Sequence, residues 1–180
     1  MEVTATKLPG VVIITPRVFD DDRGFFKETW HQPRYAEAGL PEHFVQDNHS
    51  FSVRHVLRGL HSQIKHPQGK LVSAVTGTIW DVAVNVDPTS PHFKQWVGVE
   101  LSADNHQQLY IPPGFLHGFV VLSDTANVTY KCTDVYAAGD ELGVMWNDPD
   151  LAIEWPVSAP LLSPADEANP SLQSYLQQTQ

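Results

Sequence analysis

Several histidines stand close together in the first half of the chain and could bind a metal or accept protons. His61 and His66 lie in "LRGLHSQIKHPQGKLV" (57–72). Because strand side chains alternate between faces, two residues five apart point to opposite sides, and Pro67 indicates that His66 already lies in a turn. No Asp or Glu occurs between Asn48 and Val75 to complete a ligand set. Metal sites need three or four ligands in fixed geometry, so we predict no metal, which leaves His61 a proton-transfer or a structural role.

The formal net charge of −10 argues against a nucleic-acid backbone or an anionic membrane as partner. A small anionic ligand remains compatible, because a few cations can line one pocket. The candidates are Arg23, Arg58, Lys65 and Lys70. The alternative for each of them is a solvated surface charge.

Short β-like runs separated by turn residues dominate the pattern and favour an antiparallel sandwich or barrel. A short helix is expected over Arg34–Ala38, after Pro33 and before Gly39, and another near Ser171–Gln177. From Asp148 onward the chain should wrap the β core. We expect a single domain over residues 1–180, with strands at Val11–Thr15, Phe25–Trp30, Phe44–Ser52, Leu57–Gln63, Lys70–Thr76, Thr78–Val86, Gln95–Leu101, Gln108–Ile111, His117–Val121 and Asn127–Val135.

Composition is that of a globular protein, with 42% hydrophobic and 18% charged residues in a chain of 180. No apolar run approaches the roughly 20 residues that cross a bilayer, and the N-terminus does not read as a secretory signal. The single cysteine, Cys132, cannot form an internal disulfide. A cytoplasmic location is therefore expected.

One segment resembles the second signature of the cupin superfamily, Pro-x-Gly-x-x-His, which forms a turn between two barrel strands. It is "IPPGFLHGF" (Ile111–Phe119). In metal-binding cupins this histidine joins a His-x-His pair and a glutamate, but here Gln63 stands where the second histidine would be, and no glutamate matches. The resemblance implies a mainly β, cupin-like jelly-roll barrel or sandwich with a few short helices. The missing ligands predict no metal, and we expect no other cofactor.

Ten stretches in order resemble the dTDP-4-dehydrorhamnose 3,5-epimerase family over nearly the whole chain. They are "PRVFDDDRGFFKETW" (16–30), "FVQDNHS" (44–50), "VLRGLHSQ" (56–63), "QGKLV" (68–72), "DVAVNV" (81–86), "FKQWVGVELS" (93–102), "IPPGFLHGFVVLS" (111–123), "YKCTDVY" (130–136), "WNDPDLAIEWP" (146–156) and "LLSPAD" (161–166). Family substrates are 4-keto-6-deoxyhexoses linked to dTDP. Their C3 and C5 protons flank the C4 ketone, so removing either one gives an enolate.

The resemblance implies four catalytic residues. His61 would be the base, with Asp166 fixing its tautomer and stabilising its protonated form. Lys70 would stabilise the enolate oxygen, and Tyr130 would return a proton on the opposite face. Read without the family, Lys70 would be a surface lysine and Tyr130 a core aromatic. The resemblance also implies substrate-binding roles, including guanidinium contacts to phosphate and an aromatic stack on thymine by Tyr136, for Arg23, Glu28, Gln46, Asn48, Arg58, His117, Tyr136 and Glu141.

Two positions depart from the family pattern, with Ser62 in place of a common aromatic and Ala165 in place of a common lysine. Either change could affect affinity or the carbon that is inverted. Double epimerisation, giving dTDP-4-dehydro-L-rhamnose, is our main prediction. The alternatives are inversion at C3 or C5 alone, a metal-dependent cupin, and a sugar-nucleotide binding module without catalysis. The family also implies a homodimer, through an apolar run at Val11–Thr15 that could join a neighbour's sheet.

Overall fold

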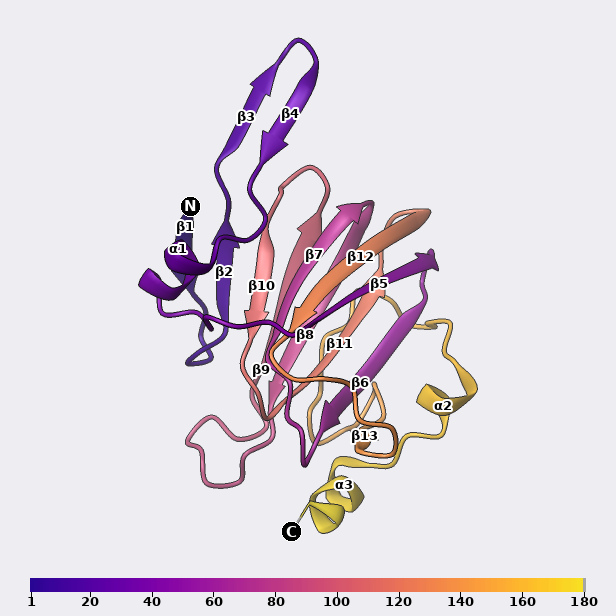
Figure 1. Cartoon of the computed structure of the whole chain (residues 1–180). Coiled ribbons are helices and arrows are strands. Elements are labelled where there is room, and N and C mark those ends of the chain that lie inside the picture. Colours follow the sequence, from indigo (N-terminus) through magenta and orange to yellow (C-terminus); the bar gives the residue numbers. More distant parts are fainter. Residues whose placement is uncertain (180) are drawn as a thin grey trace.

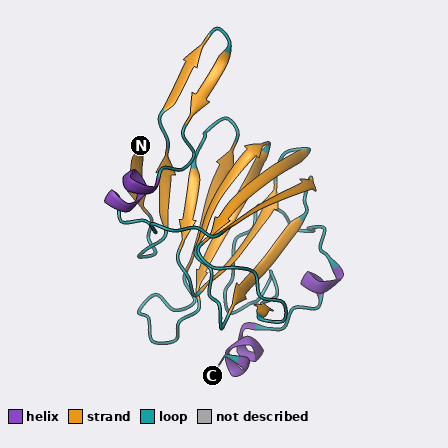
Figure 2. Cartoon of the chain, viewed as in Figure 1, coloured by secondary structure: helices purple, strands orange, loops and turns teal. Residues whose placement is uncertain are grey.

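The computed structural model describes residues 1–179 and is built mainly of antiparallel strands in two facing sheets (Figures 1 and 2). The larger sheet has six strands in the order β1-β2-β10-β7-β12-β5. Their bounds are β1 Glu2–Ala5, β2 Val12–Thr15, β10 Gln108–Ile111, β7 Lys70–Thr76, β12 Thr125–Cys132 and β5 Gln46–Val53.

The smaller sheet has five strands in the order β13-β6-β11-β8-β9. Their bounds are β13 Glu141–Gly143, β6 Leu57–Gln63, β11 Phe115–Val121, β8 Thr78–Asn85 and β9 Trp96–Ser102. The two sheets do not close on each other, so the architecture is a cupin-like sandwich, as predicted, rather than a closed barrel.

The space between the sheets is filled by alternate apolar side chains from both of them. Val72 and Val128 come from the larger sheet, and Ile79 and Phe119 from the smaller one. Strand β11 is buried along almost its whole length, because its outer face is covered as well. Leu172 and Tyr175 near the C-terminus pack on that outer face. The prediction that the chain beyond Asp148 wraps the β core is confirmed.

Three short helices complete the fold: α1 Gln32–Glu37, α2 Pro164–Glu167 and α3 Leu172–Gln178. The first and third match the predicted helices within two residues. Helix α2 was not predicted, since four residues give no readable periodicity. Its N-cap is Ser163, whose hydroxyl accepts the Asp166 N–H. Helix α2 contacts strand β6, and this contact places Asp166 beside that strand. Figure 1 shows α2 on the outer side of β6.

The N-terminal region differs most from expectation. Strand β4 covers Gly24–Lys27 and pairs with β3 (Val18–Asp21) in a hairpin that projects from the sandwich (Figure 1). The predicted strand Phe25–Trp30 therefore ends too late, because Trp30 packs on Tyr35 and Phe44 instead of continuing the ladder. The short strands β1, β3 and β13 were also missed. Within residues 1–179 no helix is long and apolar enough to cross a membrane.

Candidate active site

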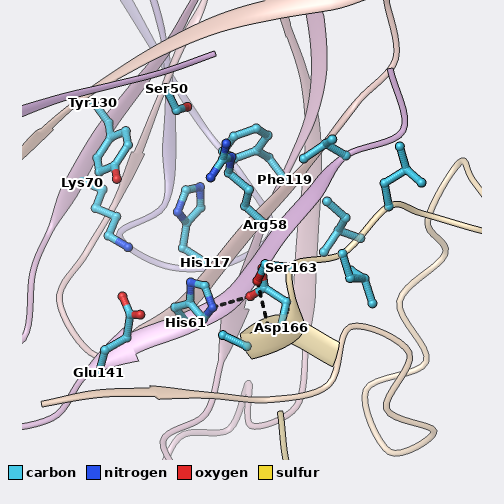
Figure 3. Close-up of a pocket in the computed structure, with 15 residues that line it drawn as sticks. Ser50, Arg58, His61, Lys70, His117, Phe119, Tyr130, Glu141, Ser163 and Asp166 are labelled. Atoms are coloured by element: carbon cyan, nitrogen blue, oxygen red, sulfur yellow. Dashed lines mark hydrogen bonds and ion pairs between the residues drawn. The ribbon is translucent and has the colours of Figure 1, made fainter. Parts of the chain in front are cut away.

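A cavity of about 480 Å³ opens between the two sheets. It is lined by polar side chains on facing walls, with Lys70 and Tyr130 from the larger sheet and His61, Arg58 and His117 from the smaller one. Figure 3 shows these groups pointing into the same space. Seven of the twelve predicted site residues line it: His61, Asp166, Lys70, Tyr130, Arg58, His117 and Glu141.

A β-bulge brings Arg58 and His61 to the same wall. On a regular strand, residues three apart point to opposite faces. Here β6 pairs with β11 through Arg58↔Phe119 and His61↔His117, so β6 holds one residue more than its partner between these pairs. Gly59 makes this close approach possible, because a Cβ there would lie 2.5 Å from the His117 carbonyl oxygen and the residue's φ is +106°.

His61 forms a short contact with a carboxylate. Its Nε2 donates to Asp166 Oδ1 at 2.6 Å, which leaves Nδ1 as the nitrogen that can accept a proton. Figure 3 shows Nδ1 on the side of the ring away from Asp166. The carboxylate also accepts hydrogen bonds from the Ser163 hydroxyl at 2.8 Å and the Gly59 N–H at 3.3 Å. Burial would raise the pKa of Asp166, but hydrogen bonds from His61 and Ser163 together hold that pKa below its ordinary value.

Two groups with shifted pKa values lie on the opposite wall. Burial lowers the pKa of the Lys70 ammonium, although the charges of Glu141 and Asp81 partly oppose this. Burial also raises the pKa of the Tyr130 phenol, so that it stays protonated at neutral pH. The Lys70 ammonium lies 6.0 Å from the centre of the Tyr130 ring. This wall therefore combines a positive charge with a proton donor.

A second histidine–carboxylate pair lies beside the cavity, and its histidine lines the wall. His117 Nε2 donates to Asp81 Oδ1 at 2.8 Å, and Asp81 is fully buried. Its Oδ2 has no hydrogen-bond partner among residues 1–179. Sequence reasoning missed Asp81, although a charged residue within the apolar run "DVAVNV" was a usable signal. It also missed the cavity residues Ser50, Phe119 and Ser163.

Five predicted binding residues do not line this cavity. Arg23 is exposed in the β3–β4 hairpin and pairs with Asp21, whereas Glu28 pairs with Arg34 at 2.8 Å. Asn48 lines a neighbouring cavity of about 320 Å³ that shares Tyr130 with the first. Gln46 and Tyr136 contact each other outside the cavity, where the Tyr136 N–H donates to Gln46 Oε1 at 2.8 Å.

Three positions depart from the family pattern or from the cupin signature, and the structure shows what each of them contacts. The Ser62 hydroxyl is buried and lies 2.7 Å from the Tyr175 hydroxyl of α3, whereas Ala165 lines the cavity. Gln63, at the place of a cupin metal ligand, directs its amide to the backbone of two loops. Among residues 1–179, no group of three or more His, Cys, Asp or Glu side chains is placed to hold a metal ion.

Fold and site together define a cupin-like β-sandwich with a polar cavity and a histidine–carboxylate pair between its sheets. The model of the dTDP-4-dehydrorhamnose 3,5-epimerase family matches residues 5–174. The chain belongs to that family.

Individual relatives support the same assignment. The chain is 55% identical over 168 residues to a dTDP-4-dehydrorhamnose 3,5-epimerase of Pseudomonas aeruginosa, covering 92% of this chain and 93% of that protein. A crystal structure of a 3,5-epimerase from Legionella pneumophila in complex with dTDP-4-keto-L-rhamnose aligns with a TM-score of 0.93 and 47% identity, over 96% of this chain and 93% of that one. A 3'-monoepimerase from Streptomyces bikiniensis, in complex with dTDP-quinovose, aligns with a TM-score of 0.91 and 32% identity, over 97% and 90% of the two chains.

Proposed function

We propose that the protein epimerises dTDP-4-dehydro-6-deoxy-D-glucose at C3 and C5, giving dTDP-4-dehydro-L-rhamnose. The observation that carries this proposal is the placement of a carboxylate-bound histidine and a protonated tyrosine on facing walls of one cavity. Epimerisation requires such an arrangement, because a proton must leave one face of the sugar and return to the other. The relatives at about half identity are enzymes of this reaction.

In the proposed mechanism, His61 Nδ1 removes the proton next to the C4 ketone. Asp166 stabilises the resulting imidazolium through the Nε2 hydrogen bond. Lys70 donates to the developing enolate oxygen, where one preorganised donor is worth about 10²–10³ in rate. Tyr130 then protonates the carbon from the facing sheet. His61 then releases its proton to solvent and Tyr130 regains one from solvent, which restores the base and the acid. The same sequence at the second carbon completes the double inversion.

Substrate binding in this proposal uses the cations at the cavity wall. Arg58 is held by hydrogen bonds from its Nε to the Ser52 hydroxyl at 3.0 Å and from its Nη2 to the Phe51 carbonyl at 3.3 Å, which leaves Nη1 to donate to phosphate oxygens. His117 and Glu141 would contact the sugar or nucleotide from the same cavity. Gln46, Asn48 and Tyr136 would bind the thymidine part beyond the cavity.

We also propose that the active form is a homodimer. The run Val11–Thr15, expected to join a neighbour's sheet, contains β2, which already pairs with β1 on one side and β10 on the other. The proposed contact therefore lies at the β3–β4 hairpin, which projects from the sandwich and exposes Phe25 and Phe26. Contact with the partner would bring Arg23 and Glu28 to a ligand. Light scattering at micromolar concentration should give the mass of two chains. We retain a single domain over residues 1–180 and a cytoplasmic location as parts of the same proposal.

Deuterium uptake tests the function directly. The enzyme, incubated with dTDP-4-keto-6-deoxyglucose in D₂O and followed by NMR, should introduce label at C3 and at C5 with both centres inverted. Label and inversion at C3 alone would identify a single-site enzyme like the 3-epimerase of Streptomyces niveus, to which the chain is 40% identical. If folded enzyme introduces no deuterium into the sugar, the enolate mechanism is contradicted.

The Tyr130→Phe variant should still exchange the sugar protons with solvent, but its rate of inversion should be about 10²-fold lower than that of the wild type.

A further inference from the structure

Strand β6 ends in a buried glutamine that makes three hydrogen bonds to backbone groups. Gln63 Nε2 donates to the His66 carbonyl at 2.7 Å and to the Val135 carbonyl at 3.1 Å, while its Oε1 accepts from the Ala137 N–H at 2.8 Å. Its side chain is only 5% exposed. One amide group thus connects the loop after β6 with the loop between β12 and β13.

The loop over residues 133–140 is attached at its start, where Thr133 exchanges two hydrogen bonds with Gly69 and the Gln68 amide donates to the Asp134 carbonyl at 2.8 Å. It contains no helix or strand, and the β13 strand that follows it is only three residues long. Gln46 of strand β5 holds it from the facing sheet, through the Tyr136 N–H. At its far end, Asp140 accepts hydrogen bonds from the N–H groups of Lys65 and His66. Gln63 contacts the residues on either side of Tyr136, so Gln63 and Gln46 together fix the middle of the loop, before its attachment at Asp140.

This loop leads directly into the cavity wall. Glu141 lines the cavity and lies opposite Gln63 in the β13–β6 ladder, whereas Gly143 lies opposite His61. Tyr136, which exposes 55% of its surface, lies between the two backbone groups that Gln63 holds. A shift of the loop would therefore displace Tyr136 and Glu141 together, without moving His61 in the middle of its strand.

We propose that Gln63 is a positioning residue that holds loop 133–140 in the conformation that presents Tyr136 and Glu141 to the nucleotide. The inference rests on the proposed function, because it assumes that the ligand carries a nucleotide. An amide is required at this site, since two carbonyl oxygens need donors and one N–H needs an acceptor. Glutamate lacks the donors and methionine lacks both, so either would leave buried backbone groups unpaired.

The test separates binding from chemistry. Gln63→Met should weaken dTDP binding about 10-fold by calorimetry and raise KM similarly, with kcat at saturating substrate changed less than about threefold. Asn85→Leu is the matched control, because Asn85 is also a buried amide, accepts from the Asp87 N–H at 3.1 Å, donates to the Ser90 hydroxyl at 3.3 Å, and lines neither cavity. It should lower thermal stability as much as Gln63→Met does, but leave dTDP affinity unchanged.

A double-mutant cycle then tests the route through the loop. In a Tyr136→Ala background, Gln63→Met should weaken dTDP binding much less than in the wild type, because the ring it positions is gone. Fully additive effects, or a Gln63→Met protein that binds dTDP like the control, would overturn the inference. Wild-type protein that fails to bind dTDP at all would instead contradict the proposed function, so the two failures are distinguishable.

Discussion

Two histidines on the adjacent strands β6 and β11 line the cavity, and each is paired with a carboxylate. The two pairs differ in their exposure and in the hydrogen bonds of their carboxylates. His61 exposes 27% of its side chain and its partner Asp166 exposes 6%, whereas His117 exposes 7% and Asp81 none. Both carboxylate oxygens of Asp166 accept hydrogen bonds, but Asp81 uses only Oδ1.

The difference follows from where the carboxylates lie in the fold. Asp81 is in the middle of β8, surrounded by the core between the sheets. Asp166 instead comes from helix α2, outside the sheet, and reaches His61 from the edge of β6. An open pair supported on both oxygens can change its protonation during a reaction, because charge on the ring is stabilised and a substrate can reach the free nitrogen. A closed pair whose carboxylate is buried behind the cavity wall is suited to hold one ring in place.

The largest expected effect comes from removing the base of the open pair. His61→Asn should lower kcat by about 10²–10⁴, the usual contribution of a positioned general base, while dTDP affinity by calorimetry stays within about threefold. His92→Asn is the control, since His92 is partly exposed, does not line the cavity, and bonds through its ring to the nearby Gln95. Near-normal turnover in His61→Asn would remove this pair from the chemistry and end the distinction between the two pairs.

Matched substitutions of the two carboxylates sharpen the comparison. Asp166→Asn should lower kcat by about 10²–10³ with little change in KM, because an amide cannot stabilise the imidazolium. Asp81→Asn should act mainly on stability, lowering the free energy of unfolding by about 3 kcal/mol, since it leaves a buried histidine without its charged partner. Steady-state kinetics and urea unfolding measure both quantities. Equal effects of the two variants on both would contradict the assignment of one open and one closed pair.

Lys70 provides a pH test of the wall that faces the open pair. If its ammonium stabilises the enolate, activity should fall on the alkaline side at a pH below the ordinary 10.5, because burial lowers the pKa of this lysine. Stability should rise with pH over the same window, since the unfolded state then binds more protons than the folded one. Burial raises the pKa of Tyr130, which moves its titration in the alkaline direction, opposite to the shift of Lys70.

Lys70→Arg separates these contributions, because a guanidinium remains charged throughout that range. The variant should turn over more slowly but lose the alkaline decline in its pH–rate profile. An unchanged alkaline limb would assign that titration to another group and leave Lys70 without its proposed role.

The smallest expected effect comes from Ser163, whose hydroxyl donates to the second carboxylate oxygen of Asp166, a contact that Asp81 lacks among residues 1–179. Ser163→Ala should lower kcat about fivefold and the free energy of unfolding by about 1 kcal/mol. Because the pKa of Asp166 is lowered in the folded state, this residue stabilises the fold at every pH above its ordinary pKa of 3.8. This stabilisation is lost as the pH falls through the pKa of the folded state. Ser163→Ala should therefore reduce the difference in stability between pH 7 and pH 3, as measured by urea unfolding.

Ser171→Ala is the control for that variant, because Ser171 caps helix α3 in the same way, away from the cavity. It should lower stability by a similar amount at pH 7 without reducing kcat. A loss of activity as large as that of Ser163→Ala would mean that both serines act only through the stability of the C-terminal segment.

Much of the fold was readable from local pattern. Strands such as Leu57–Gln63 and Lys70–Thr76 were predicted with their observed bounds, because alternation and turn residues mark them clearly. Short elements such as β13 and α2 were missed, since three or four residues carry no period. The prediction that placed Arg23 and Glu28 at the ligand remains a prediction, because both lie outside the cavity of the single chain.

Residue types and motif order alone identified a cupin-like epimerase and selected His61, Asp166, Lys70 and Tyr130. That information is local, since it depends on which side chains can exchange protons and on the stretches around them. Only the tertiary structure decided that Arg58 and His61 share a wall, because a bulge against β11 breaks the alternation that the sequence implies. It also revealed Asp81 beneath His117 and the glutamine that holds loop 133–140. Hydrogen bonds between residues far apart in the chain determine these features, and no local pattern encodes them.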